Sequence, residues 1–308
     1  MMRNQRTAYG EALVKLGADH PGVVALEADL GKSTMSCLFE QAYPSRYFQM
    51  GIAEASMVST AAGLALAGFT PFVHSFAVFA SGRAYDQIRS SVCIPRLNVR
   101  ICGSSAGLSD FGDGKTHQSV DDIAIMRVLP NMTVLSPADA VETELMVGAL
   151  GDWCGPVYLR VNRNDLPVLS GAHAPFELGK PRLMREGEHI AVFATGIMVS
   201  MALEAAEALK TEGISVRVVN IHTIKPLDVQ AVRAYASGMR AVLTAEEHSV
   251  IGGLGSAVLE ALAGDRVPVS VLGIQDRFGA SAANYGELMA AYGLTAEAMA
   301  SRIRMMLK

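Results

Sequence analysis

Short apolar segments alternate with helical patterns along most of the chain. Residues 3–17 place Ala8, Leu13 and Leu16 on one side of a helix, and residues 23–27 (VVALE) read as a short buried strand. The same alternation predicts helices at 54–67, 82–91 and 138–150 and strands at 71–75, 98–102, 131–135 and 157–161. Strands that alternate with helices indicate a parallel sheet with both faces covered.

This pattern is interrupted between residues 165 and 187, where Pro and Gly recur without clear periodicity. It then resumes with strands at 189–194, 215–219, 241–245 and 267–272 and helices at 198–211, 228–236 and 254–263. We therefore predict an α/β protein with two parallel-sheet α/β domains, at residues 1–170 and 188–308, joined by a linker at 171–187.

Residues 55–82 contain no charged side chain, which raises the question of a membrane helix. A membrane-spanning helix needs about 20 continuous apolar residues, but Gly68 and Pro71 break this stretch near its middle. We interpret the stretch as a buried helix followed by a buried strand, and we expect no membrane association.

The composition of the 308 residues excludes several classes of protein. Half of the residues are hydrophobic and 18% are charged, which is too apolar for a disordered chain. The net charge is −4 and no run of Lys and Arg reaches five residues, so a nucleic-acid surface is not expected. Four cysteines lack CxxC spacing and the N-terminus lacks an apolar leader, which favours reduced thiols and a cytoplasmic protein.

Polar turns follow three of the predicted strands. Residues 28–33 (ADLGKS) follow the first strand, residues 106–118 (AGLSDFGDGKTHQ) follow the strand at 98–102, and residues 162–165 (NRND) follow the strand at 157–161. Ligands of open parallel sheets bind outside the carboxyl ends of the strands. These turns are therefore the predicted place of a functional site.

Several side chains near these turns have both a structural and a functional interpretation. Glu54 opens an apolar helix, where the helix dipole also favours a solvated carboxylate. Phe76 and Phe79 are three residues apart, a spacing that is also typical of core packing. His117 lies in a Gly-rich loop, where a surface histidine without a function is equally expected. Gly112-Asp113-Gly114 resembles the start of a diphosphate and Mg²⁺ motif, but its downstream Asn-Asn pair is absent.

Taken in order, longer strings of the sequence resemble the transketolase family. GIAEASM at 51–57, residues 61–89, GDGKTHQSVDDIAIMR at 112–127 and PNMTVLSPADAVE at 130–142 are similar to its pyrimidine-binding domain. TIKPLD at 223–228 and AEEHSVIGGLGSAV at 245–258 are similar to its C-terminal domain. The resemblance covers nearly the whole chain and implies these two domains.

The resemblance implies that the chain binds thiamine diphosphate. Glu54 matches the carboxylate that meets N1′ of the aminopyrimidine, where a shared proton favours the imino tautomer that deprotonates C2. This role requires a carboxyl desolvated enough to hold a proton. Phe76 and Phe79 match aromatic residues that pack the pyrimidine, and Asp29 matches an acidic residue near the cofactor.

The resemblance also implies a substrate site for sugar phosphates. His117 matches the histidine that binds the reacting hydroxyls of the donor, so it joins Glu54 as a candidate catalytic residue. Asp113 matches the residue that reads the C2 hydroxyl of the acceptor. Arg163 matches the arginine that binds the sugar phosphate, a task suited to a guanidinium fork, and Arg6 and Ser33 complete that phosphate site.

The chain departs from the family at three points. Ser105 stands where a histidine is expected twelve residues before His117, and Gly82 stands where an aromatic residue is expected. The domain that binds the diphosphate and Mg²⁺ is missing, and the chain begins where that domain would end. We therefore expect no metal ligands here. A separate chain is expected to supply the diphosphate- and Mg²⁺-binding (PP) domain, in an α2β2 heterotetramer.

The implied reaction is transfer of a two-carbon ketol (glycolaldehyde) unit from a ketose phosphate to an aldose phosphate, with activity only when the partner is bound. Three alternatives remain open. One is the β-type subunit of a 2-oxo acid dehydrogenase E1, and another is half of a deoxyxylulose-phosphate synthase, which shares RAYDQ at 83–87. The third is a non-catalytic regulatory paralogue. The particular sugars are not readable from the sequence.

Overall fold

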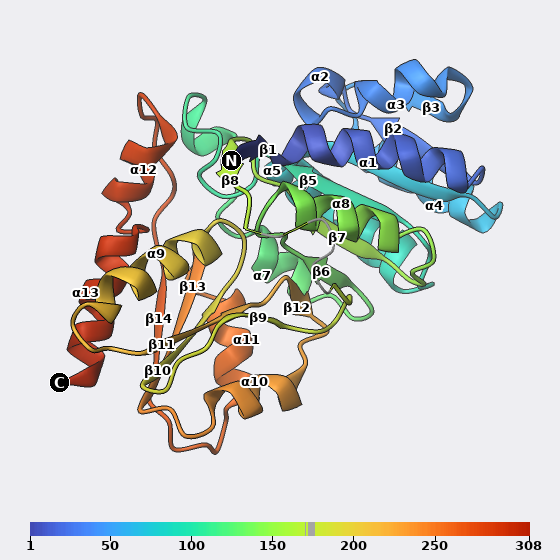
Figure 1. The fold of residues 1–308 in the computed structure, drawn as a ribbon. Coiled ribbons are helices and arrows are strands. Elements are labelled where there is room, and N and C mark those ends of the chain that lie inside the picture. The colour runs from blue at the N-terminus through green and yellow to red at the C-terminus, as the bar shows by residue number, and fades with distance from the viewer. Residues whose placement is uncertain (170, 172–175) are drawn as a thin grey trace.

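The computed structural model describes residues 1–169, 171 and 176–308, which form two helix-covered sheets (Figure 1). The first sheet has seven strands in the order β12-β6-β7-β5-β4-β2-β3, and all neighbouring pairs except β12–β6 are parallel. Its strands are β2 Val23–Glu27, β3 Tyr47–Gln49, β4 Thr70–Phe76, β5 Arg100–Ser104, β6 Thr133–Leu135, β7 Val157–Arg160 and β12 Thr223–Lys225.

The second sheet has five strands in the order β14-β13-β10-β11-β9, with β9 antiparallel. Its strands are β9 Arg182–Arg185, β10 Ile190–Ala194, β11 Val216–Asn220, β13 Ala241–Ser249 and β14 Val269–Ile274. A separate antiparallel pair joins β1 (Met2–Asn4) to β8 (Asp165–Pro167).

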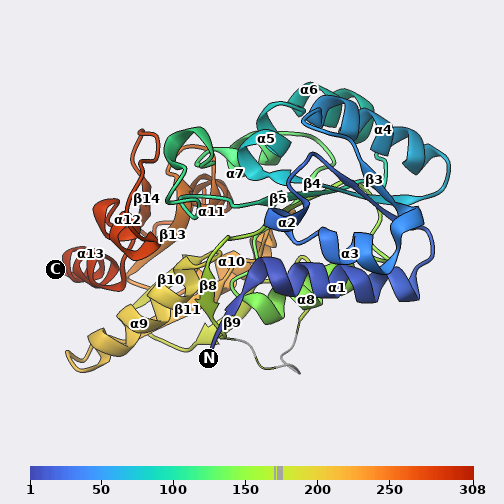
Figure 2. The same ribbon diagram turned by 90° about the horizontal axis from the view of Figure 1, so that it is seen from above.

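Helices cover both faces of each sheet, as Figure 2 shows for the first. On that sheet α1, α3 and α8 pack on one face, and α4, α6 and α7 pack on the other. On the second sheet α9, α12 and α13 cover one face, and α10 and α11 cover the other. The helices are α1 Gln5–Asp19, α2 Gly31–Thr34, α3 Cys37–Ala42, α4 Glu54–Leu66, α5 Ala77–Gly82, α6 Tyr85–Gln87, α7 Asp122–Arg127, α8 Ala140–Ala149, α9 Met198–Lys210, α10 Val229–Ala236, α11 Leu254–Ala261, α12 Tyr285–Ala291 and α13 Ala296–Leu307.

Side-chain caps explain where several of these helices begin. Asn4 accepts hydrogen bonds from two backbone N–H groups at the start of α1, and Asp139 and Asp228 do the same for one N–H group of α8 and α10. Each cap satisfies a donor that the first helical turn would otherwise leave without a partner.

The predicted α/β class and the parallel sheets are confirmed. The predicted helix at 82–91 is only partly right, because α5 begins at Ala77, directly after β4, and a π-helical segment follows α6 at Ile88–Cys93. The strand predicted at 98–102 lies two residues later. Among the described residues, no helix is long and apolar enough to cross a membrane.

The predicted boundaries at 170 and 188 stay a prediction, and residues 172–175 of the proposed linker lie outside the described residues. The structure adds two facts about this region. Strand β9 lies within the proposed linker and belongs to the second sheet. Strand β12, from the second half of the chain, adds to the edge of the first sheet. The two halves are therefore joined by backbone hydrogen bonds as well as by side chains.

A buried cluster of polar side chains forms hydrogen bonds between the first half of the chain and strand β13 of the second half. Glu247 of β13 accepts hydrogen bonds from the Leu108 N–H group (2.7 Å) and from the Asn162 amide (3.3 Å), both in the first half. Arg160 donates to the Glu247 carbonyl and pairs with Asp122 at 2.8 Å. Burial raises the pKa of Glu247 to about 7, although the positive charge of Arg160 opposes the shift.

We predict that Glu247→Gln becomes more stable relative to the native chain as the pH rises. Below about 4.3, its pKa in the unfolded chain, Glu247 is protonated in both states. Because its folded pKa is raised to about 7, the stability due to its protonated form is lost as the pH rises through that value. Between pH 5 and 8 the difference in unfolding free energy should shift in favour of Gln by on the order of 1–3 kcal/mol.

Denaturant unfolding at both pH values measures this shift. Glu260→Gln, at an exposed carboxylate, is the control and should show no comparable shift. A pH profile of Glu247→Gln parallel to that of the native chain would contradict the burial argument.

Candidate active site

Most of the predicted site residues lie at or just after the carboxyl ends of the parallel strands of the first sheet, in loops or in the first turns of helices. Ser33 lies in α2, after β2, and Phe76 ends β4. His117 lies in the loop after β5, and Arg163 follows β7. Arg6 reaches the same place because β1 pairs with β8, and the Asn4 amide donates to the Arg163 carbonyl (3.0 Å).

Glu54 is buried, with 3% of its side chain exposed at the start of α4. Its carboxylate accepts hydrogen bonds from the Ser75 hydroxyl (3.2 Å) and from Arg83 Nη1 (3.1 and 3.3 Å to its two oxygens). The alternative of a solvated carboxylate is therefore wrong. The expected desolvation of this group is present, and its catalytic role stays a prediction.

Arg83 is the residue that the sequence analysis missed. Its guanidinium carbon lies 4.0 Å from the centre of the Phe79 ring, and about half of its side chain is exposed. Its spacing of four residues after Phe79 was the available signal, because residues four apart share a helical face. Arg83 contacts both oxygens of the Glu54 carboxylate, so the predicted contact of Glu54 with a ring nitrogen requires one of these hydrogen bonds to be exchanged.

The two phenylalanines and His117 form one aromatic group. The Phe76 and Phe79 rings stack with centres 6.1 Å apart, and the His117 ring meets their faces edge-on at 6.2 and 5.4 Å. Within the described part of the chain, neither phenylalanine belongs to the core clusters of the first sheet. Phe76 is nevertheless buried (4% exposed) and Phe79 is half-buried, so only Phe79 presents part of its surface to solvent, and the role of both rings in binding stays a prediction.

Arg163 lies at the far side of this aromatic group. Its guanidinium carbon is 5.8 Å from the centre of the Phe76 ring, and its Nη1 is 2.6 Å from Asp110 Oδ2 and 3.9 Å from Asp113 Oδ2. Burial raises the pKa of Asp110, and Arg163 acts in the opposite direction. A continuous set of contacts therefore runs from Glu54 to Asp113.

Arg6 and Ser33 join the same region from another side. Arg6 Nη1 donates to the Ser33 carbonyl (2.7 Å). Burial lowers the pKa of Arg6, and the positive charge of Arg163 lowers it further, which places the two arginines in one electrostatic neighbourhood. The structure thus brings together Arg6, Ser33 and Arg163 as the resemblance implied.

Asp29 lies apart from these contacts. It is exposed, its backbone φ is 64°, and its N–H group donates to the Gln49 side chain (2.9 Å). It shares a surface cavity of about 410 Å³ with Ser33, at the carboxyl end of β2. No contact described for this chain joins Asp29 to Glu54, so its proximity to a cofactor stays a prediction.

Ser105, the residue at the expected histidine position, is fully buried and has a backbone φ of 53°. Its hydroxyl and that of Ser104 have no hydrogen-bond partner among the described residues. Direct contact between Ser105 and a substrate therefore requires this loop to move.

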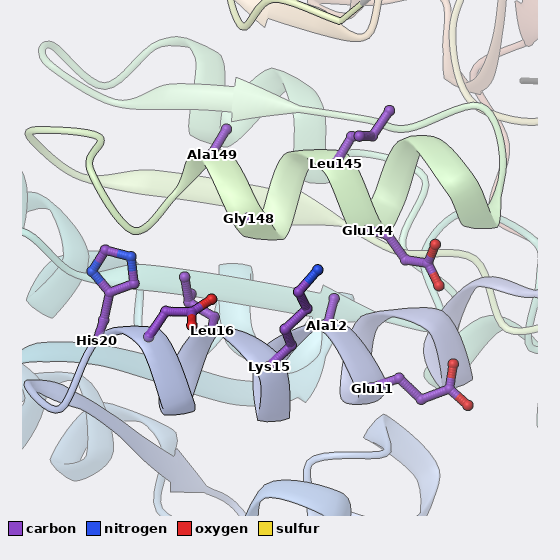
Figure 3. A pocket seen from close by; sticks show the side chains of 10 residues that line it. Glu11, Ala12, Lys15, Leu16, His20, Glu144, Leu145, Gly148 and Ala149 are labelled. Atoms are coloured by element: carbon purple, nitrogen blue, oxygen red, sulfur yellow. The ribbon is translucent and has the colours of Figure 1, made fainter. Parts of the chain in front are cut away.

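A second cavity of about 560 Å³ lies between α1 and α8 and contains none of the predicted site residues (Figure 3). His20 and Ala149, at one end of it, precede β2 and β7, so this end lies near the amino ends of the strands. Ligands of open parallel sheets bind at the opposite edge. Among the described residues, no group of His, Cys, Asp and Glu has the arrangement of a metal site.

The residues around Glu54 fit the aminopyrimidine of thiamine diphosphate. The buried Glu54 carboxylate is hydrogen-bonded to Ser75, which precedes Phe76, and to Arg83, which lies over the Phe79 ring. A proton-exchanging group for a ring nitrogen and apolar surface for the ring itself therefore occur together. Glu54, Phe76 and Phe79 would hold that ring.

Comparison with known families matches residues 2–168 to the pyrimidine-binding domain of transketolase and residues 179–299 to its C-terminal domain. A transketolase C-terminal section from Methanocaldococcus jannaschii is 42% identical over 98% of this chain and 95% of its own length. The 6-deoxy-6-sulfo-D-fructose transketolase subunit SqwH from Clostridium sp. is 43% identical over 89% of this chain and 85% of its own length. A solved split-gene transketolase, described as an inactive β4 tetramer, superimposes with a TM-score of 0.90 and 44% identity, covering 100% of this chain and 99% of that one.

We predict that Arg83 and Glu54 are energetically coupled. Arg83→Met removes the charge but keeps an apolar stem over Phe79, and it should lower the free energy of unfolding by about 1–2 kcal/mol because a buried carboxylate loses its cation. The half-exposed position of Arg83 keeps this loss below that of a fully buried pair.

In a Glu54→Gln background the same change should cost less than half as much, as measured by a double-mutant cycle of denaturant unfolding. Arg89→Met, at an exposed arginine nearby, is the matched control. Strictly additive effects at positions 54 and 83 would contradict the coupling.

Proposed function

The chain belongs to the transketolase family, and we propose that it is the pyrimidine-binding and C-terminal subunit of a split, thiamine-diphosphate-dependent transketolase. The reaction is transfer of a two-carbon ketol unit from a ketose phosphate to an aldose phosphate. The observation that carries the proposal is the continuous set of contacts from the buried Glu54, through the aromatic group, to Arg163.

Bound thiamine diphosphate supplies the carbanion chemistry that breaks and forms the carbon–carbon bond. Glu54 holds a proton at N1′ of the pyrimidine, and Phe76 and Phe79 pack the ring and exclude water from it. For Glu54 to meet N1′, a hydrogen bond from Arg83 must be released, and the Arg83 side chain is half exposed, so water can take the place of the carboxylate as its partner. His117, whose ring touches both phenylalanines, is placed to bind the reacting hydroxyls of the donor.

The far side of the aromatic group binds the rest of the sugar. Arg163 and Arg6 provide positive charge for the terminal anionic group, and Ser33 lies beside Arg6. Asp113 is exposed and 3.9 Å from Arg163, where a carboxylate accepts hydrogen bonds from a sugar hydroxyl. Reacting carbons and terminal anion are thus bound on opposite sides of Phe76.

A second chain completes the enzyme in this proposal by supplying the Mg²⁺ and diphosphate ligands, and the assembly is an α2β2 heterotetramer. The similar solved structure is described as an inactive tetramer of β chains, which supports dependence on a partner. Four large apolar side chains near α4 and β3 are exposed, which is typical of a surface that another chain covers. They are Phe48, Ile52, Leu66 and Phe69. We place the enzyme in cytoplasmic carbohydrate metabolism.

The alternatives fit the site less well. A 2-oxo acid has no terminal phosphate, so the pairing of Arg163 with Arg6 would serve no substrate. A non-catalytic paralogue has no need of a carboxylate buried beside aromatic faces. A deoxyxylulose-phosphate synthase half would share these residues, but the chain spans 47% of such a synthase, against 95% and 85% of a transketolase section and a transketolase subunit.

We predict that the purified chain alone has no ketol-transferase activity and binds thiamine diphosphate poorly, because this subunit is proposed to hold only the pyrimidine end of the cofactor. Titration calorimetry with thiamine diphosphate and Mg²⁺ measures the binding, and co-purification with the partner should restore both binding and transfer. Micromolar affinity of the isolated chain for thiamine diphosphate would contradict the two-chain proposal.

We predict that Glu54→Gln slows hydrogen–deuterium exchange at C2 of the bound cofactor by about 10²–10⁴-fold, the usual worth of a general acid–base group. Gln keeps the shape and a hydrogen bond but cannot exchange a proton with N1′. Quenched-flow NMR of the two-chain complex reads the exchange rate directly. Assembly should be preserved, Glu40→Gln at an exposed carboxylate is the control, and exchange at the native rate would rule out Glu54 as the activating group.

A further inference from the structure

The arginine proposed to bind the terminal anion of the substrate already has an anionic partner within the chain. Arg163 Nη1 is 2.6 Å from Asp110 Oδ2, and the Asp110 side chain is 3% exposed. Asp113 lies farther away, at 3.9 Å, and its side chain is 55% exposed. The two aspartates therefore differ sharply in how far solvent screens their charges.

Asp110 is held in a tightly bonded loop. Its carbonyl accepts hydrogen bonds from the Gln118 side chain (3.0 Å) and from the Gly114 N–H group (3.3 Å). The preceding Ser109 accepts from the Arg163 N–H group (3.3 Å) and, through its carbonyl, from the Asn164 amide (2.9 Å). These bonds join the Asp110 loop to the Arg163 loop and hold the two residues next to each other.

Asp110 offsets part of the positive charge of this subsite. Arg6 and Arg163 are partly exposed and contribute two positive charges, and the buried Asp110 contributes one negative charge, which leaves one positive charge for a ligand. Asp113 and Asp165 also lie near these arginines, but both are exposed, so solvent screens their charges. Burial raises the pKa of Asp110, and the adjacent guanidinium favours its ionised form. A phosphate ester carries about −1.5 to −2 near neutral pH, whereas a sulfonate carries a single charge.

We propose that Asp110 is a specificity-determining residue that matches the terminal-group subsite to a single negative charge. This inference rests on the proposed function, because it concerns the substrate of the same site. A second negative charge on the ligand would lie close to the buried Asp110 carboxylate, and little solvent is present there to screen the repulsion. The inference keeps the proposed ketol transfer and revises its preferred donor: a sugar that ends in a sulfonate or another singly charged group is favoured over the matching phosphate dianion.

The test compares two donors with the same carbon skeleton in the complex of both chains. Fructose 6-phosphate and 6-deoxy-6-sulfofructose differ at the terminal group, and hydroxypyruvate is a reference donor without a remote anion. With glycolaldehyde as acceptor, the native enzyme should have a higher kcat/KM for the sulfonate than for the phosphate at pH 7.5. Asp110→Asn should move this ratio at least fivefold toward the phosphate.

Asp165→Asn is the matched control, because it removes an exposed charge that acts on Arg6 and should change the ratio less than twofold. Asp110→Ser is a second charge-removing variant in case Asn impairs folding, and thermal unfolding checks both. The inference is overturned if the native enzyme prefers the phosphate donor, or if the ratio of kcat/KM values shifts less than fivefold in both folded Asp110 variants. In either case, transfer from hydroxypyruvate would leave the proposed function intact. No transfer from any donor would overturn the proposed function and the inference with it.

Discussion

The candidate site depends on one buried hydrogen bond, from the Leu108 N–H group to the Glu247 carboxylate across the two halves of the chain. Gly107 permits this contact, since its φ is 66° and a Cβ there would lie 2.5 Å from the Glu247 carboxyl carbon. The loop that begins at this bond carries Asp110 and His117. The second sheet therefore helps to set the position of the loop that carries Asp110 and His117 at the edge of the first sheet. Burial raises the pKa of Glu247 to about 7, which means that burying this carboxylate in its charged form is unfavourable.

Two ion pairs define the electrostatics of the site, one at each end of the aromatic group. Arg83 neutralises Glu54, and Asp110 neutralises Arg163. In the proposed chemistry, Glu54 exchanges a proton with the cofactor and Arg163 binds the anionic end of the sugar. In this structure each of these two groups is already paired, Glu54 with Arg83 and Arg163 with Asp110. Ligand binding is thus an exchange of partners within a preformed network, and the partners tune how readily that exchange occurs.

Long elements with strong periodicity were predictable from the sequence. Strand β2 and helices α4 and α9 lie within one residue of their predicted bounds, because their apolar positions follow a single period over many residues. Strands β3 and β12 have three residues each and show no period, and tertiary pairing alone makes them strands. The prediction for the segment after β4 was wrong for a different reason, because a short α5 and a π-helical segment are found where one regular helix was expected.

The sequence by itself determined the alternation of strands and helices, the family, and the identity of Glu54, His117 and Arg163 as candidates. These are properties of residue type and local spacing, which do not depend on what lies opposite. Only the tertiary structure decided that Glu54 meets Arg83, 29 residues away, and that Arg163 meets Asp110, 53 residues away. Charged residues are common in the turns of an α/β chain, and the order of strands in the sheet selects which of them become neighbours. Burial then decides how strongly each pair interacts, since the same two charges attract weakly in water and strongly where solvent is excluded.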